Sequence, residues 1–283
     1  MREDFGVFIL THGRAGRVYT VDSLKKAGYT GRLYFVIDNE DDQADSYRHI
    51  YGAENVIVFD KEAEMQRCDT MDNFGKKGVI LFARNACFDI AKTLGLKYFL
   101  ELDDDYTGFY FRHADKNKLA AVECKQLDRL FEDMLDFLDA SGSITVALSQ
   151  GGDYLGGVNR KYYWKMLSRK AMNSFFCRTD KPFKFFGTIN EDVNTYTTLG
   201  NKGILMFSTT QASLVQKETQ KNKGGMTETY IDGGTFLKSF YSVMAMPSCV
   251  KVDMMGSSRR RIHHKINWNC CVPLILNEKY RKT

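Results

Sequence analysis

The sequence predicts an α/β fold, a single domain in which helices flank a mostly parallel β-sheet. Apolar, strand-like runs alternate with helical patterns through the first half of the chain, and this alternation is typical of a parallel sheet with helices on its faces. Several of the apolar runs end in clusters of polar residues. No repeat and no Pro/Gly/Ser-rich linker divides residues 1–283, and three prolines leave few breaks in the pattern.

Each expected element follows from the spacing of its apolar residues. Short continuous apolar runs indicate buried strands, whereas apolar positions three and four residues apart indicate helices. Gly28 and Gly95 follow two of the helical patterns and would end them. The expected elements are strands at Phe5–Leu10, Leu33–Ile37, Val56–Phe59, Tyr98–Asp103 and Ile144–Leu148, and helices at Val18–Ala27, Leu81–Leu94 and Val193–Leu199.

Composition limits the classes of protein. A net charge of +5 permits an anionic partner without requiring one. No apolar stretch reaches the ~18 to 20 residues that span a bilayer, and Met1–Asp4 does not begin a signal peptide. We therefore expect a cytoplasmic protein without a membrane partner. Seven scattered cysteines match neither a disulfide framework nor a C-x-x-C zinc pattern, which predicts reduced thiols.

Three consecutive carboxylates, Asp103, Asp104 and Asp105, end the apolar run that begins at Tyr98. Such side chains repel one another unless a cation lies among them. Oxygen ligands suit Mg²⁺ or Mn²⁺, and these ions usually keep substrate phosphates as further ligands. The triplet predicts a metal-diphosphate site, although an acidic surface turn would have the same sequence.

Polar residues follow the other predicted strands. Thr11-His12-Gly13-Arg14 comes after the first strand and offers backbone and guanidinium donors, while Asp38 after the second can accept from a base or a ribose hydroxyl. In parallel sheets ligands collect at the carboxyl ends of the strands. We therefore expect Thr11, His12, Arg14 and Asp38 at the binding site of a nucleotide.

Two further pairs extend this site. Arg84 and Asn85, early in the helix before the acidic strand, would meet a diphosphate, unless they form a solvated helix face. Gly151 and Gly152 follow a strand and permit close backbone approach to a ligand, although a tight turn would use them as well. The loop after the first strand has neither the P-loop pattern nor G-x-G-x-x-G, which excludes P-loop and classical dinucleotide-binding proteins.

Taken together, these residues resemble the fold-A nucleotide-sugar glycosyltransferases, and within them the TET/JBP-associated glycosyltransferases encoded largely by bacteriophages. The resemblance implies transfer of a sugar from a UDP-sugar to the hydroxymethyl group of 5-hydroxymethylcytosine or 5-hydroxymethyluracil in DNA. It also implies a nucleotide-binding half at 1–115, and at 116–283 an acceptor half with a carboxyl-terminal metal-ligand segment. The matching segments are Thr11–Arg14, Ala83–Asn85, Asp103–Asp105, Asn190–Asp192, Lys238–Met244 and Pro247–Lys251.

The resemblance also implies roles at the metal site. Asp103 or Asp104 would touch the ribose and sugar, and Asp105 would be the principal metal ligand, with Asp103 beside it. His263 or His264 would complete the site, and an imidazole ligand shifts the preference from Mg²⁺ toward Mn²⁺. A titrating basic patch is the alternative for the two histidines.

Glu191 and Asp192 are the candidate catalytic residues. They begin a predicted helix with Asn190 as a possible N-cap, and complementarity to the helix dipole alone would explain acidic residues there. The resemblance favours catalysis instead, with Asp192 as the base that takes the acceptor's proton. Transfer would invert the anomeric carbon, while the metal and Arg84 stabilise the leaving diphosphate.

Two basic groups are candidates for DNA contacts. One is interleaved with the aromatic residues 162–164, and the other precedes the two histidines; an amphipathic helix with solvated cations is the alternative for the first. A glycan acceptor, a sugar-nucleotide nucleotidyltransferase and a noncatalytic DNA-binding protein remain open. The candidate DNA-binding residues are Arg160, Lys165, Arg259, Arg260 and Arg261.

Overall fold

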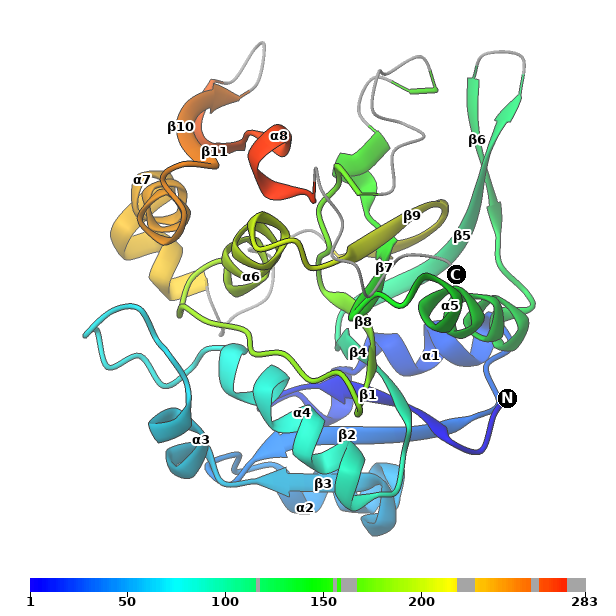
Figure 1. The fold of residues 1–283 in the computed structure, drawn as a ribbon. Coiled ribbons are helices and arrows are strands. Elements are labelled where there is room, and N and C mark those ends of the chain that lie inside the picture. Colours follow the sequence, from blue (N-terminus) through cyan, green and yellow to red (C-terminus); the bar gives the residue numbers. More distant parts are fainter. Residues whose placement is uncertain (116–117, 155–156, 159–166, 218–226, 256–259, 274–283) are drawn as a thin grey trace.

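A computed structural model describes residues 1–115, 118–154, 157–158, 167–217, 227–255 and 260–273. Within these residues a nine-stranded sheet has the order β3-β2-β1-β4-β8-β7-β9-β5-β6 (Figure 1). Its strands are β1 (Phe5–Leu10), β2 (Arg32–Asp38), β3 (Val56–Phe59), β4 (Tyr98–Asp103), β5 (Tyr106–Asp115), β6 (Lys118–Glu123), β7 (Thr145–Ser149), β8 (Ser174–Arg178) and β9 (Met206–Gln216).

The amino-terminal part of the sheet is parallel. β3, β2, β1 and β4 pair side by side in parallel, with Leu10 opposite both Val36 and Asp103, so the ends of β1, β2 and β4 meet at one edge. β8 joins antiparallel to β4 and β7, and β7 and β9 are parallel again. The predicted α/β sheet flanked by helices is confirmed, and its longest parallel stretch comes from the first 103 residues.

Helices cover both faces of the sheet because successive residues of its strands point apolar side chains to opposite faces. Phe5, Val7 and Ile9 share one core with α1 and α5, while Phe8 and Leu10 share the other with α4 and α6. The helices are η1 (Ala15–Arg17), α1 (Tyr19–Lys26), α2 (Ala44–Tyr51), η2 (Ala53–Asn55), α3 (Lys61–Arg67), α4 (Leu81–Thr93), α5 (Leu127–Ser141), η3 (Gly151–Tyr154), α6 (Glu191–Asn201), α7 (Thr227–Ala245) and α8 (Trp268–Cys271).

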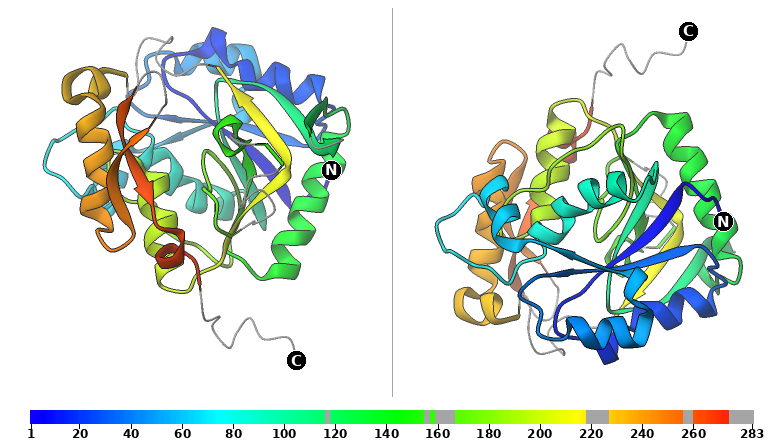
Figure 2. Two further views of the ribbon diagram at one scale, coloured as in Figure 1. Left: turned by 90° about the horizontal axis from the view of Figure 1, so that it is seen from above. Right: turned by 90° about the horizontal axis from the view of Figure 1, so that it is seen from below.

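A two-stranded antiparallel ribbon of β10 (Val250–Met255) and β11 (Arg261–Ile266) packs against α7, and α8 packs against α6. Figure 2 shows this carboxyl-terminal group beside α6, away from β2 and β3. α7 is kinked at Gly234, whose φ of 61° and ψ of −167° suit glycine alone. α7 also contacts α6, so the ribbon of β10 and β11 is joined to α6 through α7.

The predicted elements agree closely with the structure. β1 and β3 have the predicted bounds, and Gly95, with a φ of 67°, follows α4 as its stop. Asn190 occupies the predicted N-cap position of α6, but its side chain makes no capping hydrogen bond: its φ of 53° is left-handed, and its side-chain amide donates to the Lys238 carbonyl at 2.6 Å. The seven cysteines are free thiols, as predicted.

No helix in the described part of the chain is both long and apolar enough to cross a membrane. The division into a nucleotide-binding half and an acceptor half stays a prediction, as does the cytoplasmic location.

Candidate active site

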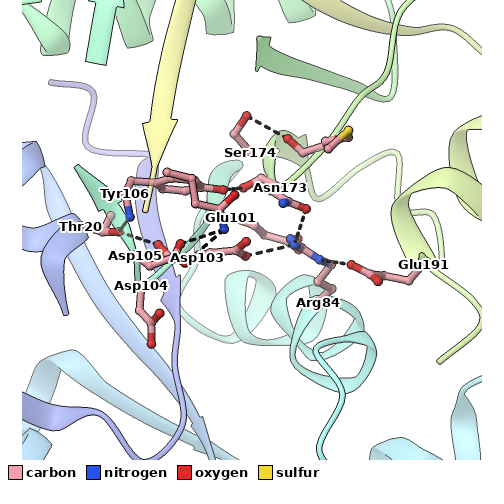
Figure 3. A network of polar contacts seen from close by, with 12 residues as sticks. Thr20, Arg84, Glu101, Asp103, Asp104, Asp105, Tyr106, Asn173, Ser174 and Glu191 are labelled. Atoms are coloured by element: carbon pink, nitrogen blue, oxygen red, sulfur yellow. Dashed lines mark hydrogen bonds and ion pairs between the residues drawn. The ribbon is translucent and has the colours of Figure 1, made fainter. Parts of the chain in front are cut away.

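The loop after β1 is fastened to the end of β4 through Asp104. The Thr11 hydroxyl donates to one carboxylate oxygen at 2.8 Å, and Arg14 forms an ion pair with the other at 2.9 Å. The Tyr47 hydroxyl, from α2, accepts from the Arg14 amide at 2.9 Å. Asp104 is 4% exposed, and Figure 3 shows it pointing away from Arg84. Thr11, Arg14 and Asp104 are three of the predicted nucleotide-sugar residues. Their contacts hold the loop after β1 to the end of β4.

Asp38, at the end of β2, lies between two cationic partners. His12 Nδ1 is 2.8 Å from one carboxylate oxygen and Lys61 Nζ is 2.7 Å from the other. Although burial opposes the shift, these hydrogen bonds lower the pKa of Asp38 to about 2, and the hydrogen bond that His12 donates to Asp38 raises the pKa of His12. The side chain of His12 is 54% exposed. Asp38 is therefore ionised at neutral pH, and His12 is the member of the pair that a ligand can reach.

A fully buried arginine organises the centre of the site. Arg84, on α4, is 1% exposed and contacts three carboxylates, two from β4 and one from α6 (Figure 3). Its guanidinium lies 3.1 Å from Glu191, 3.4 Å from Glu101 and 3.1 Å from Asp103. The ring of Phe175 adds a cation–π contact at 5.1 Å. A buried charge requires such partners, and this one connects the end of β4 with the start of α6.

One guanidinium does not neutralise the carboxylates around it. Burial raises the pKa of Glu101 to about 8 and that of Asp103 to about 7, in spite of Arg84, and the charge of Asp105 adds to the shift at Asp103. Burial also raises the pKa of Asp105, whose carboxylate accepts a hydrogen bond from Gln216 at 2.9 Å. An additional cation at the end of β4 would relieve this repulsion.

The donor chemistry of Asp103 and Asp105 fits Mg²⁺ or Mn²⁺, which take oxygen ligands and keep several positions for water and substrate phosphates. Among the described residues, however, no three His, Cys, Asp or Glu side chains gather in a group that could hold a metal ion. The structure therefore does not bring His263 or His264 to the two carboxylates.

The two histidines lie instead on β11, with ring centroids 4.2 Å apart. His264 is 7% exposed, and in the described part of the chain neither of its ring nitrogens has a hydrogen-bond partner. Burial lowers the pKa of His263 to about 4 and that of His264 to about 3, and the positive charges of Lys170 and Lys238 add to both shifts. Both imidazoles are accordingly neutral at pH 7.

The first two residues of α6 face different groups. Glu191 turns toward Arg84, whereas Asp192 experiences the charges of Lys170 and Lys238 as well as that of Arg84. Burial raises the pKa of Asp192, while the Val193 amide and the nearby cations oppose the rise. Burial and the charge of Asp192 raise the pKa of Glu191. Asp192 is thus a buried carboxylate that follows the Arg84-bound Glu191 and experiences the positive charges of Lys170 and Lys238.

The family model of the TET-associated glycosyltransferases matches residues 5–225. These residues span β1 through β9 and include Asp103–Asp105 and Glu191-Asp192. The chain belongs to this family. The predicted resemblance is confirmed, and the protein is a nucleotide-sugar glycosyltransferase. No curated protein matches the chain. The ribbon of β10 and β11 lies beyond the matched residues.

Solved structures resemble this glycosyltransferase at low identity. TarS from S. aureus matches at 15% identity and a TM-score of 0.43, covering 75% of this chain and 60% of its own. Glucosyl-3-phosphoglycerate synthase from Mycobacterium tuberculosis, with Mg²⁺ and uridine-diphosphate, matches at 10% identity and a TM-score of 0.49, covering 93% of this chain and 87% of its own. The same enzyme with Mn²⁺, uridine-diphosphate-glucose and phosphoglyceric acid matches at 14% identity and a TM-score of 0.46, covering 96% of this chain and 88% of its own.

Other predicted residues of this glycosyltransferase occupy less central positions. The Asn85 side chain accepts from the Phe185 amide at 2.9 Å and donates to its carbonyl at 3.0 Å, so it ties α4 to the segment before α6. Gly151 and Gly152 begin η3, directly after β7 and Gln150. Arg260 and Arg261 are exposed at the start of β11. Arg160, Lys165, Arg259 and the aromatic residues 162–164 lie outside the described residues.

Several site residues were not predicted. Glu101 had a sequence signal, because a charged residue inside the apolar run of β4 must be buried with a partner. Gln216 and Tyr47 had none, since they reach the site from β9 and α2 through tertiary packing. Lys170 and Lys238 likewise come to Asp192 from distant segments.

Proposed function

We propose that this glycosyltransferase moves a sugar from a UDP-sugar to the hydroxymethyl group of 5-hydroxymethylcytosine or 5-hydroxymethyluracil in DNA, with Mn²⁺ or Mg²⁺ and with inversion. One observation carries the proposal. Asp103 contacts Arg84, Arg84 contacts Glu191, and Asp192 is the next residue along the chain. The acidic strand end suited to a metal-diphosphate and a candidate base are thereby fixed relative to each other. The acceptor class follows from the family resemblance.

The donor would bind along the ends of β1, β2 and β4. His12 and Asp38 would meet the base or the ribose, because His12 is accessible and Asp38 is ionised. Asp105 and Asp103 would hold the metal ion, which when bound supplies positive charge to the leaving diphosphate. Arg84 is buried among its three carboxylates, so its part is to hold Asp103 and Glu191 in place.

Asp192 would act as the base. A hydroxyl group is a weak nucleophile at neutral pH, and a carboxylate within hydrogen-bond reach takes its proton as the new bond forms. The hydroxyl oxygen bonds to the anomeric carbon, the bond from that carbon to the diphosphate breaks, and the proton passes to Asp192. The positive charges of Lys170 and Lys238 favour the ionised form that this step needs.

The test offers a panel of sugar nucleotides to the purified enzyme together with DNA duplexes that contain 5-hydroxymethylcytosine, 5-hydroxymethyluracil, cytosine or thymine. We expect a mass increase of one sugar on a hydroxymethylated duplex and none on the two unmodified duplexes. Transfer to a glycan alone would overturn the DNA acceptor. Pyrophosphate release from a nucleoside triphosphate and a sugar phosphate would identify a nucleotidyltransferase instead.

A further inference from the structure

Lys217, the residue after β9, lies at the end of β4, where Asp103–Asp105 form what we call the acidic turn. Its backbone amide donates to the Asp105 carbonyl at 3.0 Å. The side chain of the preceding residue, Gln216, donates to both carboxylate oxygens of Asp105, at 2.9 and 3.2 Å. Figure 3 shows the end of β9 beside this turn. The backbone of Lys217 is therefore fixed next to a carboxylate that is proposed to hold the metal ion.

The side chain of Lys217 rests on Tyr19, the first residue of α1. Its ammonium lies 3.1 Å from the Tyr19 hydroxyl and 4.3 Å from the centroid of the ring. The next residue, Thr20, joins α1 to the same turn, because its hydroxyl donates to the Asp103 carbonyl at 2.6 Å and accepts from the Tyr106 amide at 3.0 Å. Tyr19 is 36% exposed. The ammonium thus lies at an accessible position between two segments that both contact the acidic turn.

The charge of Lys217 is not offset by a carboxylate. Four other basic side chains near the ends of β1, β2 and β4 already contact carboxylates: His12, Arg14, Lys61 and Arg84. Lys217 differs, since in the described part of the chain its ammonium contacts the hydroxyl and ring of Tyr19 and forms no ion pair with an acidic side chain. An accessible cation of this kind attracts an anionic ligand.

We propose that Lys217 binds the diphosphate of the sugar nucleotide, exchanging its contact with Tyr19 for one with a phosphate oxygen. The inference rests on the proposed function and extends it, because it gives the diphosphate a protein ligand besides the metal ion. A lysine ammonium on its flexible stem can turn to a new partner without moving the backbone. An ion pair with a phosphate is also stronger than a contact with a neutral hydroxyl and ring.

The same contact would act during transfer. Negative charge grows on the diphosphate as its bond to the anomeric carbon breaks, and a cation already in place stabilises that charge. Arg84 is buried among three carboxylates and cannot reach the diphosphate. Lys217 would supply the protein's positive charge at this point.

The experiment separates the phosphates from the nucleoside. Calorimetry in Mn²⁺ measures the Kd of UDP and of uridine for wild type, Lys217→Met and Lys217→Arg. Lys217→Met keeps the apolar stem over Tyr19 and loses the charge, so the Kd of UDP should rise by roughly tenfold to a hundredfold. The Kd of uridine, which has no phosphate, should not change. Lys217→Arg keeps the charge and should recover most of the affinity for UDP.

Lys97→Met is the matched control. Lys97 is exposed, and its ammonium lies 4.8 Å from the centroid of the Tyr98 ring, so it makes the same kind of contact as Lys217. It precedes β4, however, at the opposite end of that strand from the acidic turn. This variant should bind UDP as wild type does. Lys217→Gln gives the same comparison if Lys217→Met does not fold.

Tyr19→Ala distinguishes phosphate binding from a purely structural link between β9 and α1. It removes the contact but leaves the ammonium, so its Kd for UDP should stay close to that of wild type. The inference is overturned if Lys217→Met binds UDP as tightly as wild type. It is also overturned if Lys217→Met and Tyr19→Ala weaken UDP and uridine to the same degree. If wild type binds no UDP, the proposed donor itself fails and this inference falls with it, which is distinct from a wild type that binds UDP without needing Lys217.

Discussion

The two sides of the dipeptide Glu191-Asp192 have opposite charge arrangements. On the side of β4, one guanidinium, Arg84, lies among Glu101, Asp103 and Glu191. On the side of α7, Asp192 experiences the positive charges of Lys170 and Lys238. In the first, acidic region three carboxylates surround one cation, whereas in the second, basic region two lysines act on one carboxylate. Neighbouring residues on one helix turn thus belong to regions that favour different ligands.

This difference suits the two parts of the proposed reaction. The acidic region would accept a metal ion with the donor's diphosphate, and the two lysines of the basic region would favour the ionised form of Asp192 that a base needs. Charges fixed in advance by the fold need no reorganisation during the reaction. Substitutions in either region, or in the dipeptide Glu191-Asp192 between them, would test this comparison.

The largest effect should come from Asp192→Asn, which removes the carboxylate on which the charges of Lys170 and Lys238 act. We expect kcat for transfer to fall by ~10²- to 10⁴-fold, the usual contribution of a general base. Binding of the donor, measured by calorimetry, should change little because the donor lies on the other side of Glu191. Near-normal turnover would remove Asp192 from the role of base.

A smaller effect should follow on the acidic side from a substitution that weakens the metal site without removing a ligand. Chelation of the metal should stop transfer, and added Mn²⁺ or Mg²⁺ should restore it. Gln216→Ala removes the side chain that donates to Asp105, and loss of such an outer contact typically weakens metal affinity by ~10- to 100-fold. Titration of activity with metal would measure this shift, with Gln211→Ala, an exposed glutamine on the same strand, as control. Full activity of metal-stripped enzyme would contradict the metal site.

The acidic region was largely predictable from the sequence, and the basic one was not. The period of the apolar residues located the ends of β1, β2 and β4, and adjacency in the sheet then brought Thr11, Asp38 and Asp103 to one edge. Buried strands have a strong local signal, since their apolar runs are continuous. Proximity at strand ends therefore follows from topology alone.

The surroundings of Asp192 depend instead on how distant segments, α7 among them, pack near α6. Lys170 and Lys238 are far apart in sequence, and no local pattern relates them to Asp192. For the same reason the sequence suggested His264 as a metal ligand, whereas the structure places it among cations. Asn190 shows the same limit, because its position before a helix predicts a cap while its side chain contacts α7.

The smallest effect concerns stability, through the buried carboxylate Glu101. Its pKa is raised by burial from an ordinary 4.5 to about 8 in the folded protein. Between these values the folded state binds more protons than the unfolded state, so stability should fall as pH rises through this window, by at most ~1.4 kcal/mol per pH unit for one proton. Glu101→Gln removes this titration, although Asp103, with its pKa at about 7, contributes in the same direction.

Urea unfolding at pH 5, 6, 7 and 8 would compare the variant with wild type, and Asp133→Asn, on the exposed surface of α5, is the control. Glu101→Gln should reduce the loss of stability between pH 5 and pH 8, and the control should not. If the variant were instead most destabilised relative to wild type at pH 8, Glu101 would be ionised and held by Arg84. The acidic region would then carry more negative charge than its burial implies, and its contrast with the basic region would sharpen.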